Sequence, residues 1–355
     1  MDKLSVAVVL GGASSEHEVS VCSAKSILAN IDRERFDVLV VGIAKDGAMY
    51  YYEDEQLLAH QTVVTGEGAV PCVISPAVNC KGIFLPEAGK RLPVDVYFPV
   101  LHGKNGEDGT IQGLFALSQT PFVGCDTQAS ADCMDKEVTH TLLEAAGVHM
   151  AKWERLTAFD FENEPVRDAQ IERIEQTLGY PVFVKPVRAG SSVGVSKAST
   201  RAELLAALET ALKEDSKVLV EEMIDGQEVE CAVLGNERPQ ASVVGEIEAC
   251  NEFYDYDAKY IQNDSKLHIP ARVSDAATEE IQKTAVHAFR AMGCTGLSRV
   301  DFFVRGKTEV ILNEINTLPG FTDISMYPKL FDACGIPYSQ LITRLIELAQ
   351  ERTAR

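Results

Sequence analysis

The sequence predicts an α/β protein whose amino-terminal part is built on a parallel β-sheet. Three apolar segments there have the composition of buried strands: residues 4–12 (LSVAVVLGG), 36–43 (FDVLVVGI) and 94–101 (VDVYFPVL). Between the first two, residues 18–31 carry apolar side chains at helical spacing. Strand, helix and strand in alternation indicate a parallel sheet with helices on both faces.

The later elements fall into two further α/β regions. The first is predicted to hold a helix at 134–147, strands at 181–187 and 193–197, and a helix at 201–213. The second is predicted to hold strands at 218–224, 230–235 and 241–248, helices at 276–292 and 340–351, and a hairpin between these helices. Because 355 residues exceed one typical core, we divide the chain into three domains, residues 1–124, 125–220 and 221–355.

Composition and charge exclude several classes of partner. The net charge of −20, from 33 basic and 53 acidic residues, opposes binding to nucleic acid or to an anionic membrane. No apolar run approaches the roughly 18 residues of a membrane span, and the first residues lead into a strand rather than a signal peptide. We therefore expect a cytoplasmic protein. Its nine cysteines are scattered without CxxC pairs, which favours buried free thiols over disulfides or zinc.

The predicted hairpin carries a candidate metal site. Strands at 300–304 (VDFFV) and 310–316 (VILNEIN) flank the turn-like segment 305–307. A turn of two or four residues would place Asp301, Glu314 and Asn316 on one face of the hairpin. Three hard oxygen ligands suit Mg²⁺ that also binds phosphate and water. Arg299 lies on the same strand face, as expected if an anion is shared there. The alternative is a solvated hairpin face with ordinary acidic residues.

Residues 183–197 (FVKPVRAGSSVGVSK) carry a candidate phosphate site. Lys185 lies on a predicted strand and is followed by a loop rich in glycine and serine, whose backbone N–H groups can surround phosphate oxygens. The competing explanation is a simple β-turn. Glu221 and Glu228 lie just after the next apolar strand, where carboxylates could accept hydrogen bonds from an adenine amino group and ribose hydroxyls. Their alternative role is that of surface acids.

Three loops are candidates for substrate binding. Glu16 lies in the glycine turn that follows the first strand; because GGASSEHEVS is not GxGxxG, a dinucleotide site is a weak interpretation. Glu16 could instead complement the helix dipole. His102 ends the strand 94–101 and could orient a substrate carboxylate or bridge through Glu16, although a histidine there is more often structural. Residues 251–270 form a long aromatic loop, expected to be a lid that becomes ordered when ligands bind.

Taken together and in order, these segments resemble one enzyme family over nearly the full chain. The matching motifs are GGxSxEHEVS, HGxxGEDGxxQG, CMDK, VKPxxxGSSVGVSK, ECAVLGN, FYDYDAKY, GCxGxxRVDxF and NEINTLPGFTxISMYPK. They resemble the D-alanine–D-alanine ligases of the ATP-grasp superfamily. The resemblance implies a three-domain ATP-grasp fold and ATP-dependent synthesis of D-alanyl-D-alanine through D-alanyl phosphate, for peptidoglycan precursors. It also implies two Mg²⁺ ions, which Mn²⁺ can replace, and a homodimer.

The resemblance also implies roles for individual residues. In this family pattern Lys136 and Lys185 hold the ATP phosphates, Glu221 and Glu228 bind adenine and ribose, and Lys259 reaches the transferred phosphate from the lid. Further nucleotide contacts are implied for Phe183, Ser192, Val193, Glu222, Ile224 and Phe303. Asp301, Glu314 and Asn316 correspond to the magnesium ligands, with Glu314 shared between both ions. The implied catalytic residues are Glu16, Ser191, Tyr260, Arg299, Gly320 and Ser325, and the implied substrate contacts are Val19, His102 and Met326.

Within this family, different segments of the sequence favour different second substrates. PVRAGSS (186–192) and SKLHIPARV (265–273) resemble D-alanine–D-serine ligases of the vancomycin-resistance type. Met326 and FYDYDAKY resemble the D-alanine enzymes instead, because the D-serine relatives usually carry an arginine at the Met326 position. A lactate-specific enzyme has a lid histidine with no counterpart at Tyr260. A different class, a catalytically silent nucleotide-binding homologue, would lack metal ligands or lysines, and none is missing.

Overall fold

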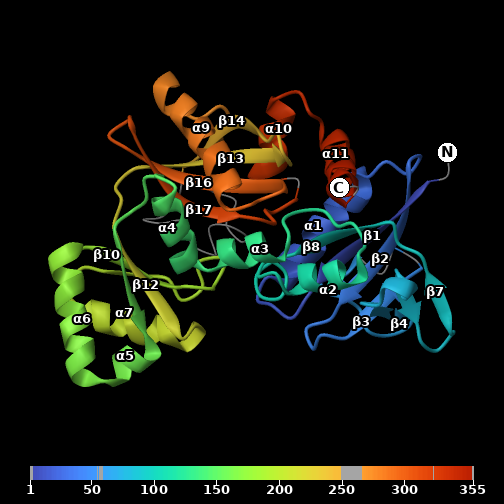
Figure 1. The fold of residues 1–355 in the computed structure, drawn as a ribbon, viewed down its shortest axis with the longest axis horizontal. Helices are drawn as coiled ribbons and strands as arrows, with labels where there is room; N and C mark the ends of the chain where they lie inside the picture. Colours follow the sequence, from blue (N-terminus) through green and yellow to red (C-terminus); the bar gives the residue numbers. More distant parts are fainter. Residues whose placement is uncertain (1–2, 54, 56–58, 249–265, 323, 354–355) are drawn as a thin grey trace.

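The computed structural model describes residues 3–53, 55, 59–248, 266–322 and 324–353. Lys259, Tyr260 and most of the predicted lid lie outside these residues. Figure 1 shows the amino-terminal sheet on one side of the molecule, and the central and carboxy-terminal sheets on the other.

The amino-terminal sheet has the strand order β4-β3-β2-β1-β8. Its strands are β1 (Leu4–Gly11), β2 (Phe36–Ile43), β3 (Met49–Tyr52), β4 (Ala69–Pro71) and β8 (Val96–Leu101). The three strands predicted from sequence, β1, β2 and β8, pair in parallel, which confirms the parallel sheet. β3 and β4 add an antiparallel edge that the apolar pattern did not predict.

Other elements cover both faces of this sheet, because β1 has apolar side chains on both faces. Alternate residues Val6, Val8 and Leu10 pack with α1 (His17–Asn30) and α11 (Tyr338–Thr353). Ala7 and Val9 pack on the other face with α2 (Thr110–Ser118) and a small sheet of β5 (Val73–Ile74), β6 (Ile83–Leu85) and β7 (Lys90–Leu92). A short 3₁₀ helix, η2 (Val78–Cys80), lies between β5 and β6.

The central sheet is fully antiparallel in the order β11-β10-β12-β9. Its strands are β9 (Trp153–Thr157), β10 (Val182–Pro186), β11 (Ser196–Ala198) and β12 (Lys217–Glu222). Helices α5 (Ala158–Glu162), α6 (Glu164–Thr177) and α7 (Arg201–Glu214) accompany it. β12 was predicted to open the third region, but it pairs with β10 and β9. We therefore propose that the second domain boundary lies after Glu222, while the three-domain division remains a prediction.

The carboxy-terminal sheet has the order β15-β14-β13-β16-β17. Its strands are β13 (Gln227–Gly235), β14 (Gln240–Glu248), β15 (Lys266–His268), β16 (Gly296–Arg305) and β17 (Glu309–Asn316). One face packs with α3 (Thr127–Met134), α4 (Lys136–Ala145) and α9 (Asp275–Ala291), and the other with α10 (Met326–Ala333) and α11. α11 therefore shares one core with the amino-terminal sheet.

The single helix predicted at 134–147 begins two residues later, because Asp135 separates α3 from α4. The backbone of Asp135 is extended, and its side chain accepts a hydrogen bond from the N–H of Val138, which caps α4. The described cysteines all have free thiols, but the prediction that they are buried is wrong for Cys22 and Cys334, which are exposed. Within the described part of the chain, no helix is long and apolar enough to cross a membrane.

Candidate functional site

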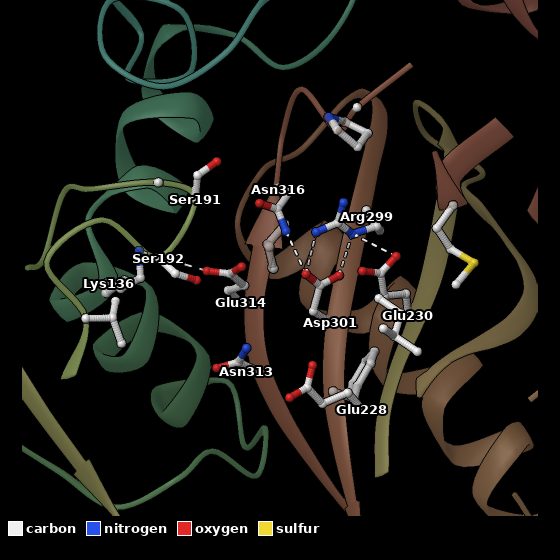
Figure 2. A pocket seen from close by; sticks show the side chains of 18 of the residues that line it. Lys136, Ser191, Ser192, Glu228, Glu230, Arg299, Asp301, Asn313, Glu314 and Asn316 are labelled. Atoms are coloured by element: carbon white, nitrogen blue, oxygen red, sulfur yellow. Dashed lines mark hydrogen bonds and ion pairs between the residues drawn. The ribbon is translucent and has the colours of Figure 1, made fainter. Parts of the chain in front are cut away.

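A cavity of about 800 Å³ lies among the three sheets. Figure 2 shows the part of its wall formed by β16, β17 and the loop that follows β10. Of the predicted site residues that the structure describes, all but Val193 line this cavity: Glu16, Val19, His102, Lys136, Phe183, Lys185, Ser191, Ser192, Glu221, Glu222, Ile224, Glu228, Arg299, Asp301, Phe303, Glu314, Asn316, Gly320, Ser325 and Met326. Residues more than 300 positions apart in sequence thus face one space.

The hairpin of β16 and β17 places the predicted residues on one face, but not through the predicted turn. Arg305 pairs with Glu309, so the connecting loop has three residues, and the predicted two- or four-residue turn is wrong. An unbroken register from that loop would place Asp301 opposite Asn313. The register instead shifts between Phe302 and Asp301, so that Asp301 lies opposite Glu314. This β-bulge restores the predicted face.

The bulge places two consecutive side chains, Asn313 and Glu314, on the cavity wall. Asn313 Oδ1 accepts a hydrogen bond from Lys185 Nζ at 3.3 Å. Sequence analysis missed Asn313, because regular alternation along the strand places it on the face opposite to Glu314. The bulge has no signal of its own in the sequence.

The predicted metal ligands lie around the Asp301 carboxylate. Arg299 donates to both of its oxygens at 2.7 Å, and Asn316 Nδ2 donates to Oδ2 at 2.9 Å. Figure 2 shows these bonds on one face of the hairpin, with Glu314 beside them. Among the described residues no group of three His, Cys, Asp or Glu could hold a metal by itself. A set of two carboxylates and one amide still suits Mg²⁺, which keeps water and phosphate ligands.

Arg299 is held charged by acids. Its Nε lies 3.2 Å from Glu230 Oε2, in addition to the two bonds to Asp301. Burial alone would lower the pKa of the guanidinium, but Asp301 and Glu230 outweigh it and raise this pKa well above its usual value. Glu230 was not predicted as a site residue. A fixed positive charge therefore faces the cavity.

Lys185 and Glu221 form a second buried pair at the other end of the cavity. Glu221 Oε2 pairs with Lys185, and Oε1 is 2.9 Å from His140 Nε2. Burial would raise the pKa of Glu221, but Lys185 and His140 hold it well below its usual range. Both carboxylate oxygens are thus bound by protein groups, and the predicted contact between Glu221 and adenine stays a prediction. His140 was missed because its partner is 81 residues away.

The glycine-rich loop after β10 closes against the amino-terminal domain. Ser191 donates a hydrogen bond to Glu16 Oε1. A Cβ on Gly103 or Gly190 would lie 2.5 or 2.9 Å from Glu16 Oε2, so the absence of side chains there makes room for the carboxylate. Glu16 stands at the N-cap of α1 but makes no side-chain cap hydrogen bond. Its carboxylate therefore serves the interdomain contact rather than the helix end.

Two groups from the loop after β8 complete this end. The ring nitrogens of His102 lie 3.2 Å from Leu318 O and 3.2 Å from Ser23 Oγ, so they are engaged by protein groups other than Glu16. Burial lowers the pKa of His102. Glu107, which we did not predict, accepts a hydrogen bond from the Gly103 N–H at 2.7 Å. Burial and the nearby charge of Glu16 raise the pKa of Glu107 to about 8.

The sequence matches two family models that together cover most of the chain. Residues 5–125 match the model described as D-ala D-ala ligase N-terminus, and residues 142–347 match the D-ala D-ala ligase C-terminus. The chain belongs to the D-alanine–D-alanine ligase family. This confirms the family predicted from the motifs and the prediction of an ATP-dependent, ADP-forming ligase. ATP use, commonly with a divalent metal, is general in the family.

Relatives of known name and structure extend over the whole ligase chain. It is 49% identical to D-alanine–D-alanine ligase of Ruminiclostridium cellulolyticum, over 99% of this chain and 96% of the relative. It is 46% identical to D-alanine–D-alanine ligase A of Escherichia coli K12, over 100% and 98%. The VanG D-Ala:D-Ser ligase of Enterococcus faecalis superposes with a TM-score of 0.89 at 42% identity, covering 98% of this chain and 100% of that one. The D-alanine-D-alanine ligase of Coxiella burnetii gives 0.86 at 37%, covering 99% and 96%. The ATP-grasp fold is thereby confirmed.

At the far end of the ligase cavity, α10 presents its first turn. Ser325 is the N-cap residue of α10, and its Oγ accepts a hydrogen bond from the Thr322 N–H at 3.0 Å. A Cβ on Gly320 would lie 2.9 Å from Ser325 Oγ, so the chain passes close to this hydroxyl. Met326 follows, 5% exposed, and its side chain lines the cavity.

Proposed function

We propose that this protein joins two D-alanine molecules to D-alanyl-D-alanine, using ATP, for peptidoglycan precursor synthesis. The observation that carries the proposal is the single cavity in which Lys136, Lys185 and Arg299 face the hairpin carboxylates. The named relatives, which are 46–50% identical over almost the full chain, support the same reaction. All metal-type ligands and phosphate-facing lysines are present, which weighs against a catalytically silent homologue.

The reaction has two steps. The carboxylate of the first D-alanine attacks the γ-phosphorus of ATP, giving D-alanyl phosphate and ADP. The amine of the second D-alanine then attacks the acyl carbon, and phosphate leaves. The C–N bond replaces the C–O bond to phosphate, and the amine loses a proton. The cysteines have no role as nucleophiles, because no covalent enzyme intermediate is needed.

The side chains of the cavity can bind and neutralise the reacting groups. Lys136 Nζ donates to Ala189 O at 2.9 Å, which ties this cation to the glycine-rich loop that would surround the phosphates. Glu228 suits a ribose hydroxyl. Arg299, held charged by its acids, suits the tetrahedral oxyanion and the phosphoryl oxygens. Glu16, with Ser191 against it, suits the ammonium group of the first D-alanine.

Asp301, Glu314 and Asn316 would hold the divalent metal. We propose two Mg²⁺ ions that share Glu314, which Mn²⁺ can replace. When bound, the ions neutralise the charge that develops on the phosphoryl oxygens. We also propose that the protein is a cytoplasmic homodimer, on the basis of the family resemblance.

D-Serine is the second candidate for the second substrate. The likeness to the VanG D-Ala:D-Ser ligase and the segments PVRAGSS and SKLHIPARV favour it. Met326 favours D-alanine, because an apolar thioether packs against a methyl group and supplies no strong donor to a hydroxyl. Such a pocket rejects an added hydroxyl by only about a hundredfold. We therefore propose preference for D-alanine with detectable D-alanyl-D-serine at high D-serine.

Phosphate release with ATP, Mg²⁺ and D-alanine tests the activity, and quantified dipeptides test the substrate. With equal D-alanine and D-serine, D-alanyl-D-alanine should dominate. Addition of D-lactate should give no depsipeptide. No phosphate release by the folded protein with D-alanine would overturn the ligase proposal, whereas a majority of D-alanyl-D-serine would overturn only the substrate.

A further inference from the structure

Behind Met326, a glycine of β14 packs directly against α10. A Cβ placed on Gly245 would lie 2.7 Å from Met326 Sδ, 3.1 Å from Met326 Cε and 2.9 Å from Leu330 Cδ2. Gly245 has none of the positive φ values found at other glycines of the chain. An L-residue could therefore adopt its backbone conformation, and what the glycine provides is space.

The two neighbours of Gly245 differ in their freedom to move. Leu330 is fully buried in the core that α10 and α11 share with the amino-terminal sheet, so it has no free volume to enter. Met326 lines the cavity, and its unbranched thioether side chain has several rotatable bonds. A side chain at position 245 would therefore displace Met326, and the open direction is into the cavity.

The cavity wall near Met326 is apolar on the side of β14 and β15, whereas Glu230, opposite Gly245 on β13, pairs with Arg299. Ile247 and Leu267, which face each other on β14 and β15, also line the cavity. Because neither offers a hydrogen bond donor from its side chain, the size of the space on this side of Met326 decides which small side chain fits there. That size depends on how far Met326 can withdraw toward β14.

We propose that Gly245 is a positioning residue that sets the size of the second-substrate pocket by accepting the side chain of Met326. The inference rests on the proposed function and extends it to selectivity among small D-amino acids. With Gly245, Met326 withdraws and the pocket takes D-alanine and slightly larger side chains. With alanine at 245, Met326 fills part of the pocket.

The test is a competition among D-alanine, D-serine and D-2-aminobutyrate at equal concentration, with all D-alanyl dipeptides quantified. Gly245→Ala should lower the ratio of D-alanyl-D-2-aminobutyrate to D-alanyl-D-alanine by about tenfold, the lower range for one methylene in an apolar pocket. It should raise KM for the second amino acid and leave KM for ATP unchanged. An unchanged product ratio in the folded variant would overturn the inference.

Gly42→Ala is the matched control. Gly42 lies on β2, and its Cβ would come within 2.7 Å of Tyr52 Cε2, an equally close contact outside the cavity lining. Both variants should lower Tm, but only Gly245→Ala should change the product ratio. A matching change in Gly42→Ala would mean that general loosening, and not Met326, is the cause.

A double-mutant cycle tests whether residue 245 acts on selectivity through Met326. It also gives a second test if the Gly245→Ala protein fails to fold. Met326→Ala should widen acceptance of D-2-aminobutyrate, and adding Gly245→Ala to it should narrow acceptance by less than twofold. A tenfold narrowing in the Met326→Ala background would show that Gly245 acts without Met326 and would overturn the inference. Absence of every dipeptide from the unmodified protein would overturn the proposed function itself, and the inference with it.

Discussion

The two ends of the cavity each contain a buried cation paired with acids, but the two pairs differ in their surroundings. At the Lys185 end, the Glu221 side chain is 6% exposed and both of its oxygens are bound, one by Lys185 and one by His140. At the Arg299 end, the Asp301 side chain is 13% exposed and lies on an open hairpin face beside Glu314. Both acids are bound by protein groups, Asp301 by Arg299 and Asn316, but the second pair lies beside a further carboxylate, Glu314, that faces the cavity.

This difference separates a structural role from a ligand-binding role. Breaking a closed buried pair leaves an unpaired charge in the interior, at a cost of about 3–5 kcal/mol. Glu314 lies opposite Asp301 across the hairpin, and repulsion between these acids offsets the attraction of Glu314 to Lys136, 3.9 Å away, so removing the charge of Glu314 should cost little stability. Activity should depend on the open face, and stability on the closed pair.

The largest effect is expected at the open face. Glu314→Gln removes one charge without changing the shape of the side chain, so the fold should remain while turnover falls by at least roughly 10²-fold. Steady-state phosphate release at saturating Mg²⁺, together with urea unfolding, measures both properties.

Glu309→Gln is the matched control, because Glu309 lies on the same strand and pairs with Arg305 away from the cavity. It should retain near-normal turnover. A folded Glu314→Gln protein with turnover similar to that of this control would remove the metal assignment.

The second effect is expected at the closed pair. Glu221→Gln should lower the free energy of unfolding by about 3 kcal/mol, because Lys185 keeps its charge in a buried site without its counter-ion. KM for ATP should also rise. Urea unfolding of the two proteins measures the loss.

The neighbouring Glu222→Gln serves as the control for this pair. Glu222 is half-buried and lies 3.9 Å from Arg305, an arrangement worth at most about 1 kcal/mol. If both variants lose the same free energy of unfolding, the pair of Glu221 and Lys185 contributes no more to stability than the pair of Glu222 and Arg305.

The sequence predicted the open face better than the closed pair, for a physical reason. Asp301, Glu314 and Asn316 belong to one hairpin, so local strand alternation was enough to propose their common face. Even there the predicted loop length was wrong, and the residues share a face only because a β-bulge at Asn313 shifts the register. Nothing local in the sequence marks a bulge, because the extra residue is an ordinary asparagine.

The closed pair depends on contacts between distant segments. His140 lies on α4 and Glu221 on β12, and only the packing of these elements brings the two together. Sequence analysis missed Gly245 for a similar reason, because its proposed role depends on the packing of Met326 against it and not on its own backbone conformation. The whole-chain motifs identified the family, but they gave no information on such pairwise contacts.

The third effect concerns substrate selectivity, and the substitution that tests it introduces a cation near the open face. Met326→Arg should shift the competition between D-alanine and D-serine toward D-alanyl-D-serine by about tenfold, because a guanidinium supplies donors to the added hydroxyl. Dipeptides formed at equal amino-acid concentration measure it. Met326→Leu, which stays apolar, should leave the ratio within about twofold.

The smallest effect concerns an ion pair outside the cavity lining, in which the acid, Glu246, is buried but the cation, Arg272, is exposed. Glu246 accepts hydrogen bonds from the side chain and the N–H of Arg272, whose side chain is 52% exposed. These bonds lower the pKa of Glu246 from 4.5 to about 2. Since the folded pKa is the lower one, the stabilisation is present above about pH 4.5 and is lost as the pH falls toward 2.

Glu246→Gln should therefore lower the free energy of unfolding by about 1 kcal/mol at pH 7, because Arg272, the exposed half of the pair, is screened by solvent. The gap between variant and unmodified protein should narrow below about pH 4.5, where the unfolded carboxylate also takes up a proton. Urea unfolding at pH 7, 5 and 4 measures this gap, with Glu279→Gln, an exposed acid on α9, as the control. A gap that stays constant over this range would mean that Arg272 is held by shape and backbone contacts, and that charge pairing with Glu246 contributes little to stability even though this acid is buried.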